Sequence, residues 1–312
     1  MADLVLIFAN PFSGTGPNRE RVLRLEEVLK ERGLSPRVIW EHEGRVETLR
    51  EAGEALRCVV AAGGDGSVAD VLNDMRTAGR LEVPFATLPA GNENLFAQEF
   101  GFTGSPEAIA GAVVAGRTRP VDLGEAADPT APDQPGRLFT LMASAGFDAD
   151  VVRRVDRWRS DAAGGGLKRV NRMSYLPRVV GSIKGYRFPG LTLEADGRVV
   201  VGHQAYIFNI PQYGGGLRIG RHARSDDGRL AWVVFRRPGF LRLLLYHGQV
   251  ILGRHFDSKT VVHGRADRVT LRPGDGFSPP IQIDGDPAGD TPLEARVLPG
   301  ALNVIDLRVE ER

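Results

Sequence analysis

The residues with the clearest chemical potential lie between positions 63 and 69. They form the run Gly63, Gly64, Asp65, Gly66, Ser67, Val68 and Ala69. Four small apolar residues at 59–62 precede this run and are typical of the end of a buried strand, and a helix is predicted from Ser67 or Val68. Glycine amides and the positive end of a helix bind phosphate oxygens, and the carboxylate of Asp65 could hold a magnesium ion or its water shell. The run therefore predicts a nucleotide phosphate site, with an ordinary strand-to-helix turn as the alternative.

Two further polar turns follow predicted strands. A strand at 4–9 runs into Asn10, Pro11, Phe12, Ser13 and Gly14, and a strand at 83–88 opens into a turn that contains Gly91 and Asn92. Side chains of these types can hydrogen-bond phosphate or sugar oxygens, although they also mark plain turns and helix caps.

The predicted strands of this first part alternate with helices. Helices are expected at 18–32, 46–56 and 68–75, with another short strand at 37–40. This order predicts a parallel sheet, in which ligands bind at the carboxyl ends of the strands. All three polar turns would then lie at one edge of the sheet.

The second part of the chain, after a proline-rich loop at 128–136, consists of short apolar runs separated by polar turns. Strands are predicted at 138–144, 191–194, 199–209, 230–235, 259–264, 268–272, 281–284 and 293–298. The pattern is typical of an antiparallel sandwich. We therefore expect an α/β fold with a Rossmann-like parallel-sheet nucleotide domain at 1–122 and a C-terminal antiparallel β-sandwich domain at 123–300.

Composition narrows the class of protein. The 312 residues suffice for two domains, and a net charge of +1 gives no general attraction to nucleic acid. The single cysteine, Cys58, excludes a disulfide framework and fits a reducing compartment. No apolar run approaches membrane-spanning length, so we expect a cytoplasmic protein that touches membranes from outside. The sequence leaves open whether the protein forms a homodimer.

One segment departs strongly from this balanced charge. Residues 151–188 carry ten basic side chains against two acidic ones, with aromatic residues between them. Such segments bind anionic lipid surfaces, so a peripheral contact with an anionic membrane is expected here. A solvated pair of basic helices is the alternative. Because the segment lacks a recognition motif, nucleic-acid binding is not expected.

Several short motifs together resemble the diacylglycerol kinase catalytic-domain family, which includes bacterial lipid kinases and sphingosine kinases. They are Asn10-Pro11-x-Ser13-Gly14, Gly63-Gly64-Asp65-Gly66-Ser67 with Asn73, the turn around Gly91, Ala145-Gly146-Phe147-Asp148, Asp227-Gly228 and Asp284-Gly285-Asp286. The resemblance spans nearly the whole chain. It implies a β-sandwich that takes the lipid substrate, and a C-terminal segment, 301–312, that returns to the first domain.

The same resemblance implies site residues. ATP would contact Asn10 to Gly14, Gly63 to Ala69 and Asn92, and Asp286 would be the general base beside the catalytic Asp65. The family has glutamate at the position of Asp286, so the shorter aspartate must come closer or act through a water. A plain hairpin turn also explains the Asp-Gly pair at 284–285.

Further departures and metal positions follow from the resemblance. The family usually has threonine at the position of Asn92, whose side chain still offers donors and acceptors to a phosphate. The family often has aspartate at the position of Leu95, so a magnesium network of Asp65 and Asp122 would lose a carboxylate here. A second, structural magnesium would be bound by the carboxylate of Asp227 and the backbone carbonyls of Arg224 and Arg229. A type I′ turn explains these last residues as well.

The sequence therefore predicts an ATP- and Mg²⁺-dependent lipid kinase that phosphorylates a lipid hydroxyl at the membrane surface. Diacylglycerol is the first candidate for the lipid substrate. A nucleotide- or lipid-binding pseudokinase and an NAD kinase remain as alternatives.

Overall fold

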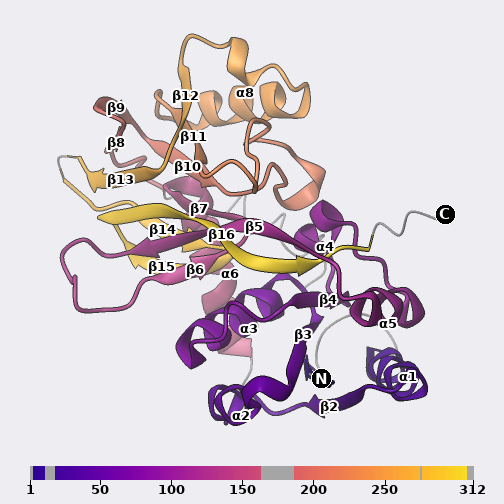
Figure 1. The fold of residues 1–312 in the computed structure, drawn as a ribbon. Helices are drawn as coiled ribbons and strands as arrows, with labels where there is room; N and C mark the ends of the chain where they lie inside the picture. The colour runs from indigo at the N-terminus through magenta and orange to yellow at the C-terminus, as the bar shows by residue number, and fades with distance from the viewer. Residues whose placement is uncertain (1–2, 11–17, 163–185, 275, 308–312) are drawn as a thin grey trace. The chain divides into compact units, whose positions relative to one another are not determined.

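The computed structural model describes residues 3–10, 18–162, 186–274 and 276–307 (Figure 1). The chain divides into two compact units. Unit 1 comprises Met1–Leu123, Ser225–Gly228 and Leu298–Arg312, and unit 2 comprises Gly124–Arg224 and Arg229–Val297. Unit 1 contains a parallel sheet and unit 2 contains antiparallel sheets, which confirms the predicted fold class.

The sheet of unit 1 has the strand order β2-β1-β3-β4, followed by the C-terminal part of β16. Its strands are β1 (Leu4–Ala9), β2 (Ser35–Ile39), β3 (Leu56–Gly63), β4 (Phe85–Pro89) and β16 (Leu293–Ile305). Neighbouring strands pair in parallel, including Val304 of β16 with Phe85 of β4. β1 and β3 are buried along nearly their whole length, as expected for parallel strands covered on both faces.

Helices connect these strands. They are α1 (Asn18–Glu31), α2 (Arg45–Glu51), α3 (Asp65–Ala78), α4 (Leu95–Phe100) and α5 (Pro106–Ala115), with a short 3₁₀ turn, η1 (Gly53–Ala55), before β3. The helix predicted to reach Leu56 ends earlier, because Gly53 adopts a left-handed φ of 54° and Leu56 already belongs to β3. α3 begins at Asp65 rather than at Ser67 or Val68, so Asp65 lies in its first turn.

Unit 2 is an antiparallel sandwich. One sheet has the order β12 (Val261–Ala266), β11 (Leu230–Phe235), β10 (Gln204–Phe208), β7 (Met142–Ala145), β14 (Pro280–Ile283) and β15 (Asp286–Asp290). The facing strands are the first part of β16, β13 (Arg268–Pro273), β8 (Leu191–Ala195) and β9 (Arg198–Gly202), together with β6 (Arg137–Phe139) paired to the end of β5 (Thr118–Ala127). Buried side chains of both layers, such as Trp232 and Leu193, form one hydrophobic core.

Three strands predicted in the second part of the chain differ most from the observed ones. The strand predicted at 138–144 is interrupted at Thr140 and Leu141 between β6 and β7, because the backbone amides there bind a carboxylate instead of a neighbouring strand. The strand predicted at 199–209 is two strands, β9 and β10. β16 continues to Ile305 as one strand, so the last predicted strand and the returning C-terminal segment are continuous.

α5 in unit 1 and α8 (Phe240–Ile251) in unit 2 were not predicted from the sequence, whereas α6 (Phe147–Ala162) covers the start of the segment 151–188, for which a pair of basic helices was the alternative. α5 has a clear start signal, because Ser105 caps it and Pro106 occupies its first position. In unit 2, α6 and α8 lie beside the sheets, with short 3₁₀ turns η3 (Gly214–Gly216) and η4 (His255–Asp257). No helix in the described ranges is long and apolar enough to cross a membrane.

Candidate active site

Three strand ends of unit 1 meet at one edge of the parallel sheet. Ala9 pairs with Ala62 between β1 and β3, and Gly63 pairs with Pro89 between β3 and β4. Beyond the strands, the amide of Asn10 donates to the carbonyl of Ala62 at 3.1 Å and the amide of Ala90 donates to that of Gly63 at 2.8 Å. The structure thus brings Asn10, the Gly63–Ser67 turn and the Gly91–Asn94 turn together. Pro11, Phe12, Ser13 and Gly14 lie outside the described residues.

The turns after β3 and β4 touch backbone to backbone. A Cβ atom built on Gly91 would lie 2.6 Å from the Cα atom of Gly64, closer than side-chain atoms approach in folded proteins. One built on Gly64 would lie 3.1 Å from the Cα atom of Gly91. Glycine is therefore needed at Gly91 for this close approach, and a side chain at Gly64 would be crowded by the backbone of Gly91.

Asn94 shapes the second of these turns rather than capping α4. Its side chain accepts a hydrogen bond from the amide of Gly91 at 2.7 Å and donates one to the carbonyl of Gly91 at 2.8 Å. It occupies the position before α4 with a left-handed φ of 52° and makes no capping bond to the helix. Asn92 is exposed on the same turn. The turn therefore presents Asn92 on a backbone that Asn94 holds in place.

Asp65 joins the two turns through a hydrogen bond. Its Oδ1 oxygen accepts from the backbone amide of Phe96 in α4 at 2.9 Å. Burial raises the pKa of Asp65, and the amides of Phe96 and Leu95 oppose that rise. The carboxylate is thus fixed in direction and poorly solvated, which suits a group that meets a charged ligand.

The first turn of α3 has amides to offer. The first hydrogen bond within the helix runs from the amide of Val68 to the carbonyl of Gly64 at 3.1 Å. The amides of Gly66 and Ser67 come before it and therefore have no acceptor within the helix. Val68 and Ala69 are buried and anchor the start of the helix, and the amide of Val68 is already used within the helix, so their predicted contact with the nucleotide stays a prediction. Such a helix start favours phosphate.

Among the described residues, no three or more His, Cys, Asp or Glu side chains lie close enough together to bind a metal ion by themselves. Leu95, where the family often has aspartate, is a buried apolar residue of α4. The single carboxylate of Asp65 fits the usual mode of Mg²⁺ binding in kinases, through one or two carboxylates together with substrate phosphates.

Asp122 of β5 binds three backbone amides within unit 1. Its Oδ2 oxygen accepts from Asp227 at 3.0 Å and from Gly228 at 2.7 Å, and its Oδ1 oxygen accepts from Gly300 at 2.8 Å. The carboxylate thereby links β5 to the loop at 225–228 and to β16. Its predicted role in a magnesium network stays a prediction.

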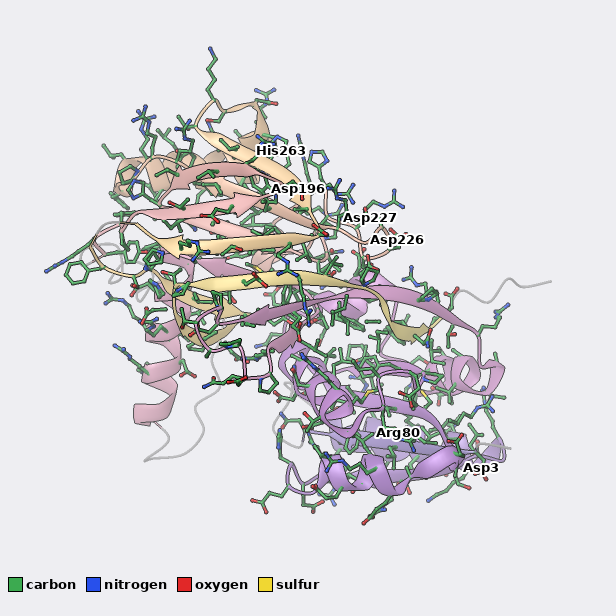
Figure 2. All side chains as sticks on the ribbon, turned by 60° about the vertical axis from the view of Figure 1, so that its left-hand side comes forward. Asp3, Arg80, Asp196, Asp226, Asp227 and His263 are labelled. Carbon is green, nitrogen blue, oxygen red and sulfur yellow. The ribbon has the colours of Figure 1, made fainter. Side chains whose placement is uncertain are left out.

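The loop that carries Asp226 and Asp227, labelled in Figure 2, comes just before β11. A positive φ is found at Gly228, 67°, and not at Asp227, so the predicted type I′ turn is wrong here, since that turn needs two positive φ angles. The side chain of Arg229 pairs with Asp196 at 2.7 Å. The structural magnesium at Arg224, Asp227 and Arg229 stays a prediction.

In unit 2, Asp284 and Gly285 form the tip of the hairpin between β14 and β15. Their φ angles of 48° and 89° are both positive, as a type I′ turn requires. The buried Asp284 carboxylate accepts from the amides of Thr140, Leu141 and Met142 at 2.7, 3.0 and 2.9 Å and from the Thr140 hydroxyl at 3.1 Å. Burial raises the pKa of Asp284 to about 6, against the effect of these donors.

Asp286, the predicted general base, is the first residue of β15. Its side chain is 48% exposed, and its Oδ2 oxygen pairs with the guanidinium of Arg137 at 2.6 Å. The hydrogen bonds of Asp284 hold the hairpin to the interrupted segment before β7. The backbone that carries the side chain of Asp286 is therefore held in place. Its role as proton acceptor stays a prediction.

A polar network in unit 2 was missed as a site. Asp148, in the first turn of α6, accepts hydrogen bonds from the Ser144 hydroxyl at 2.6 Å, from the Gln282 amide at 3.1 Å and from the hydroxyl of Tyr213. The signal was available, because Asp148 stands in the Ala-Gly-Phe-Asp motif. Burial and the neighbouring Asp148 raise the pKa of Tyr213 well above its usual range, so its hydroxyl stays protonated as a donor.

This network adjoins an apolar cavity inside unit 2. The cavity is lined by Gln204, Tyr206, Tyr213, Leu217, Ile219, Phe235, Leu243, Tyr246, His247 and Val250. Its volume of about 20 Å³ is enough for a water molecule, so a larger ligand would enter only if the surrounding side chains moved apart.

The described part of the basic segment 151–188 is partly neutralised. In α6, Arg153 pairs with Asp290 at 2.7 Å and Arg154 pairs with Asp150 at 2.6 Å. Residues 163–185 lie outside the described residues, so the anionic-membrane contact predicted for this segment stays a prediction.

Comparison with known proteins agrees with this architecture. Residues 4–126 match the diacylglycerol kinase catalytic domain, and residues 141–306 match the YegS C-terminal NAD kinase beta sandwich-like domain. The chain thus has the two domains of a lipid kinase. It belongs to the diacylglycerol kinase catalytic-domain family, in the branch with the YegS-type C-terminal domain.

Individual relatives cover nearly all of the chain. A "Diacylglycerol kinase" of Mycobacterium tuberculosis is 29% identical over 309 residues, covering 96% of this chain and 94% of the relative. A "Probable lipid kinase YegS-like" of Pseudomonas savastanoi is 30% identical over 284 residues, covering 87% and 83%. A solved diacylglycerol kinase structure from Bacillus anthracis shares the fold, with a TM-score of 0.70, 20% identity and 97% coverage of both chains.

Proposed function

We propose that this protein transfers the γ-phosphate of ATP to a hydroxyl group of a membrane lipid and that diacylglycerol is the acceptor. The observation that carries the proposal is the contact between the turns after β3 and β4, where Gly64 meets Gly91 and Asp65 binds the amide of Phe96. Two glycine turns and a helix start at one edge of a parallel sheet favour a polyphosphate ligand.

The chain's residues divide the work of phosphoryl transfer. The amides of Gly66 and Ser67, with Asn10 and Asn92, would bind the phosphates of ATP. Asp65 would hold Mg²⁺ together with those phosphates, and the metal would neutralise charge on the transferred group. Asp286 would accept the proton of the lipid hydroxyl as the hydroxyl oxygen attacks the γ-phosphorus of ATP and ADP leaves.

The β-sandwich would take the acceptor. An acyl chain would lie among the apolar residues that line the cavity, which would have to widen to admit it, and the Asp148 network beside it would offer polar groups to a glycerol headgroup. Diacylglycerol is chosen because the relative from M. tuberculosis carries that name.

The experiment that tests this function is an acceptor panel. Purified protein is incubated with labelled ATP, Mg²⁺ and mixed vesicles that contain diacylglycerol, monoacylglycerol, ceramide or a sphingoid base, and the labelled lipid is identified by chromatography. Label in phosphatidic acid supports the proposal. Label in another phospholipid corrects the acceptor, and ATP binding without any labelled lipid would favour a pseudokinase.

A further inference from the structure

Helix α8 of unit 2 has two apolar faces. The inner face, Leu243, Tyr246 and Val250, is buried. The outer face is exposed and consists of Phe240, Leu241, Leu244, Leu245, Ile251 and, just after the helix, Leu252. Leu241 and Leu252 are 74% and 72% exposed, values unusual for side chains of this size. A shallow groove along the helix is lined mainly by these leucines.

The outer face is contiguous rather than scattered. At about 100° of rotation per residue, its members fall within one sector of the helix, opposite the buried sector. Arg242 falls on one boundary between the two sectors and His247 on the other. Exposed apolar patches of this kind mark interaction sites. In Figure 1, α8 lies at the periphery of its own unit, beside β11 and β12.

The charges of α8 and of the residues directly before and after it have one sign. Residues 236–254 contain four arginines and no aspartate or glutamate. The arginines are Arg236, Arg237, Arg242 and Arg254. All four are exposed, and none forms an ion pair with a carboxylate of the described residues. An apolar helix face rimmed by unpaired arginines complements an anionic lipid surface, where headgroups attract the cations and the apolar side chains enter the boundary of the acyl region.

The charge also argues against self-association through this face. A symmetric dimer would place the same patch of each copy against the other, so the arginines of the two copies would approach one another. No carboxylate within residues 236–254 could relieve that repulsion. The bilayer is therefore the better match for this face.

The inner face of α8 connects the proposed membrane contact with the apolar cavity. Leu243, Tyr246, His247 and Val250 of α8 line the apolar cavity, so one helix separates the outer apolar face from the cavity. A bilayer under α8 would bring that cavity next to the lipid phase.

We propose that the outer face of α8 docks the protein on an anionic phospholipid bilayer, with Leu241, Leu244 and Leu245 entering the interface and the surrounding arginines binding lipid phosphates. The inference depends on the proposed lipid kinase function only in assuming that the lipid substrate binds at the cavity. The docking surface itself can be tested without catalysis.

The test is flotation of the full chain with vesicles of phosphatidylcholine alone and of equal parts phosphatidylcholine and phosphatidylglycerol. The wild type should bind the anionic vesicles preferentially. Replacing three apolar residues (Leu241→Gln, Leu244→Gln and Leu245→Gln) should weaken that binding by about tenfold or more. Arg242→Gln with Arg254→Gln should weaken binding to anionic vesicles and reduce its dependence on salt.

A matched control uses exposed valines of β9 in the same unit. Val199 and Val201 are 66% and 58% exposed, and Val199→Gln with Val201→Gln should leave vesicle binding unchanged. Unaltered binding of the triple-leucine variant, with its circular dichroism and unfolding temperature intact, would overturn the proposal. So would a lipid-free dimer, seen by sedimentation velocity, that the leucine changes dissociate.

Catalysis separates this proposal from the proposed function. If the protein phosphorylates dispersed short-chain diacylglycerol, the triple-leucine variant should keep that activity and lose activity on vesicles. If the wild type phosphorylates no lipid but floats with anionic vesicles through α8, the lipid kinase function fails and the docking surface stands.

Discussion

Gly91 approaches Gly64 so closely that a Cβ atom on Gly91 would lie 2.6 Å from the Cα atom of Gly64. This contact joins the turn after β3 to the turn after β4. It depends on the absence of a side chain at Gly91 and leaves little room for one at Gly64.

Gly91→Ala should therefore damage the site through the backbone. The added methyl group forces the two turns apart, which should lower the free energy of unfolding by about 1–3 kcal/mol and weaken ATP binding. Chemical unfolding and ATP titration measure the two effects. Gly66→Ala is the matched control for stability, because nothing lies within 4 Å of its Cβ position. Equal stability of the two variants would contradict the contact.

Asp65→Asn should separate binding from folding. Asparagine keeps an oxygen for the amide of Phe96, and it removes a charge that burial already disfavours, as the raised pKa of Asp65 indicates. Stability should hold or rise slightly, while kcat falls by about a hundredfold or more because a metal-binding carboxylate is lost. Retained kinase activity in a stable variant would exclude Asp65 from the chemistry.

Asp284 should give the protein a pH-dependent stability. The folded pKa of Asp284 is raised to about 6, above the value of about 3.9 for aspartate in an unfolded chain. Its stabilising contribution is thus fully present below about pH 4 and is lost as pH rises through about 6. Asp284→Asn should lose this dependence, so the stability gap between wild type and variant should narrow as pH rises. Urea unfolding across this range provides the measurement, and parallel pH profiles would refute the assignment.

Asp122→Ala should destabilise unit 1. The change leaves the amides of Asp227, Gly228 and Gly300 without their acceptor, for an expected loss of about 2–4 kcal/mol. Unfolding is measured in EDTA and in Mg²⁺, with the exposed Asp128→Asn as control. If Asp122→Ala is destabilised even in EDTA, the carboxylate of Asp122 stabilises unit 1 through its backbone hydrogen bonds and without a metal ion. No loss in EDTA would contradict it.

The sequence sufficed for the parts that depend on local patterns. The alternation of strands and helices predicted the parallel sheet, and the parallel order predicted that the turns at Asn10, Gly63 and Gly91 share one edge. The contact between Gly64 and Gly91 was not predicted, since it depends on the pairing of β3 with β4.

The remaining features depend on contacts between distant residues. Asp284 interrupts the strand predicted at 138–144, and its partners lie more than 140 positions away along the chain. The Asp148 network likewise joins α6 to β7, β14 and Tyr213. The apolar residues of α8 recur with a helical period, so the helix itself could have been predicted. Which of its apolar residues are buried depends on packing within unit 2, and only that packing reveals the outer face as exposed.

The transfer of labelled γ-phosphate from ATP to diacylglycerol vesicles tests the central claim most directly, with Asp286→Asn and Asp290→Asn compared. Both aspartates lie on β15, are about half exposed and pair with an arginine, so the two variants are matched in structure. We predict labelled phosphatidic acid from the wild type and from Asp290→Asn, and little label but intact ATP binding from Asp286→Asn. No labelled lipid from the wild type, or equal label from Asp286→Asn, would contradict the account.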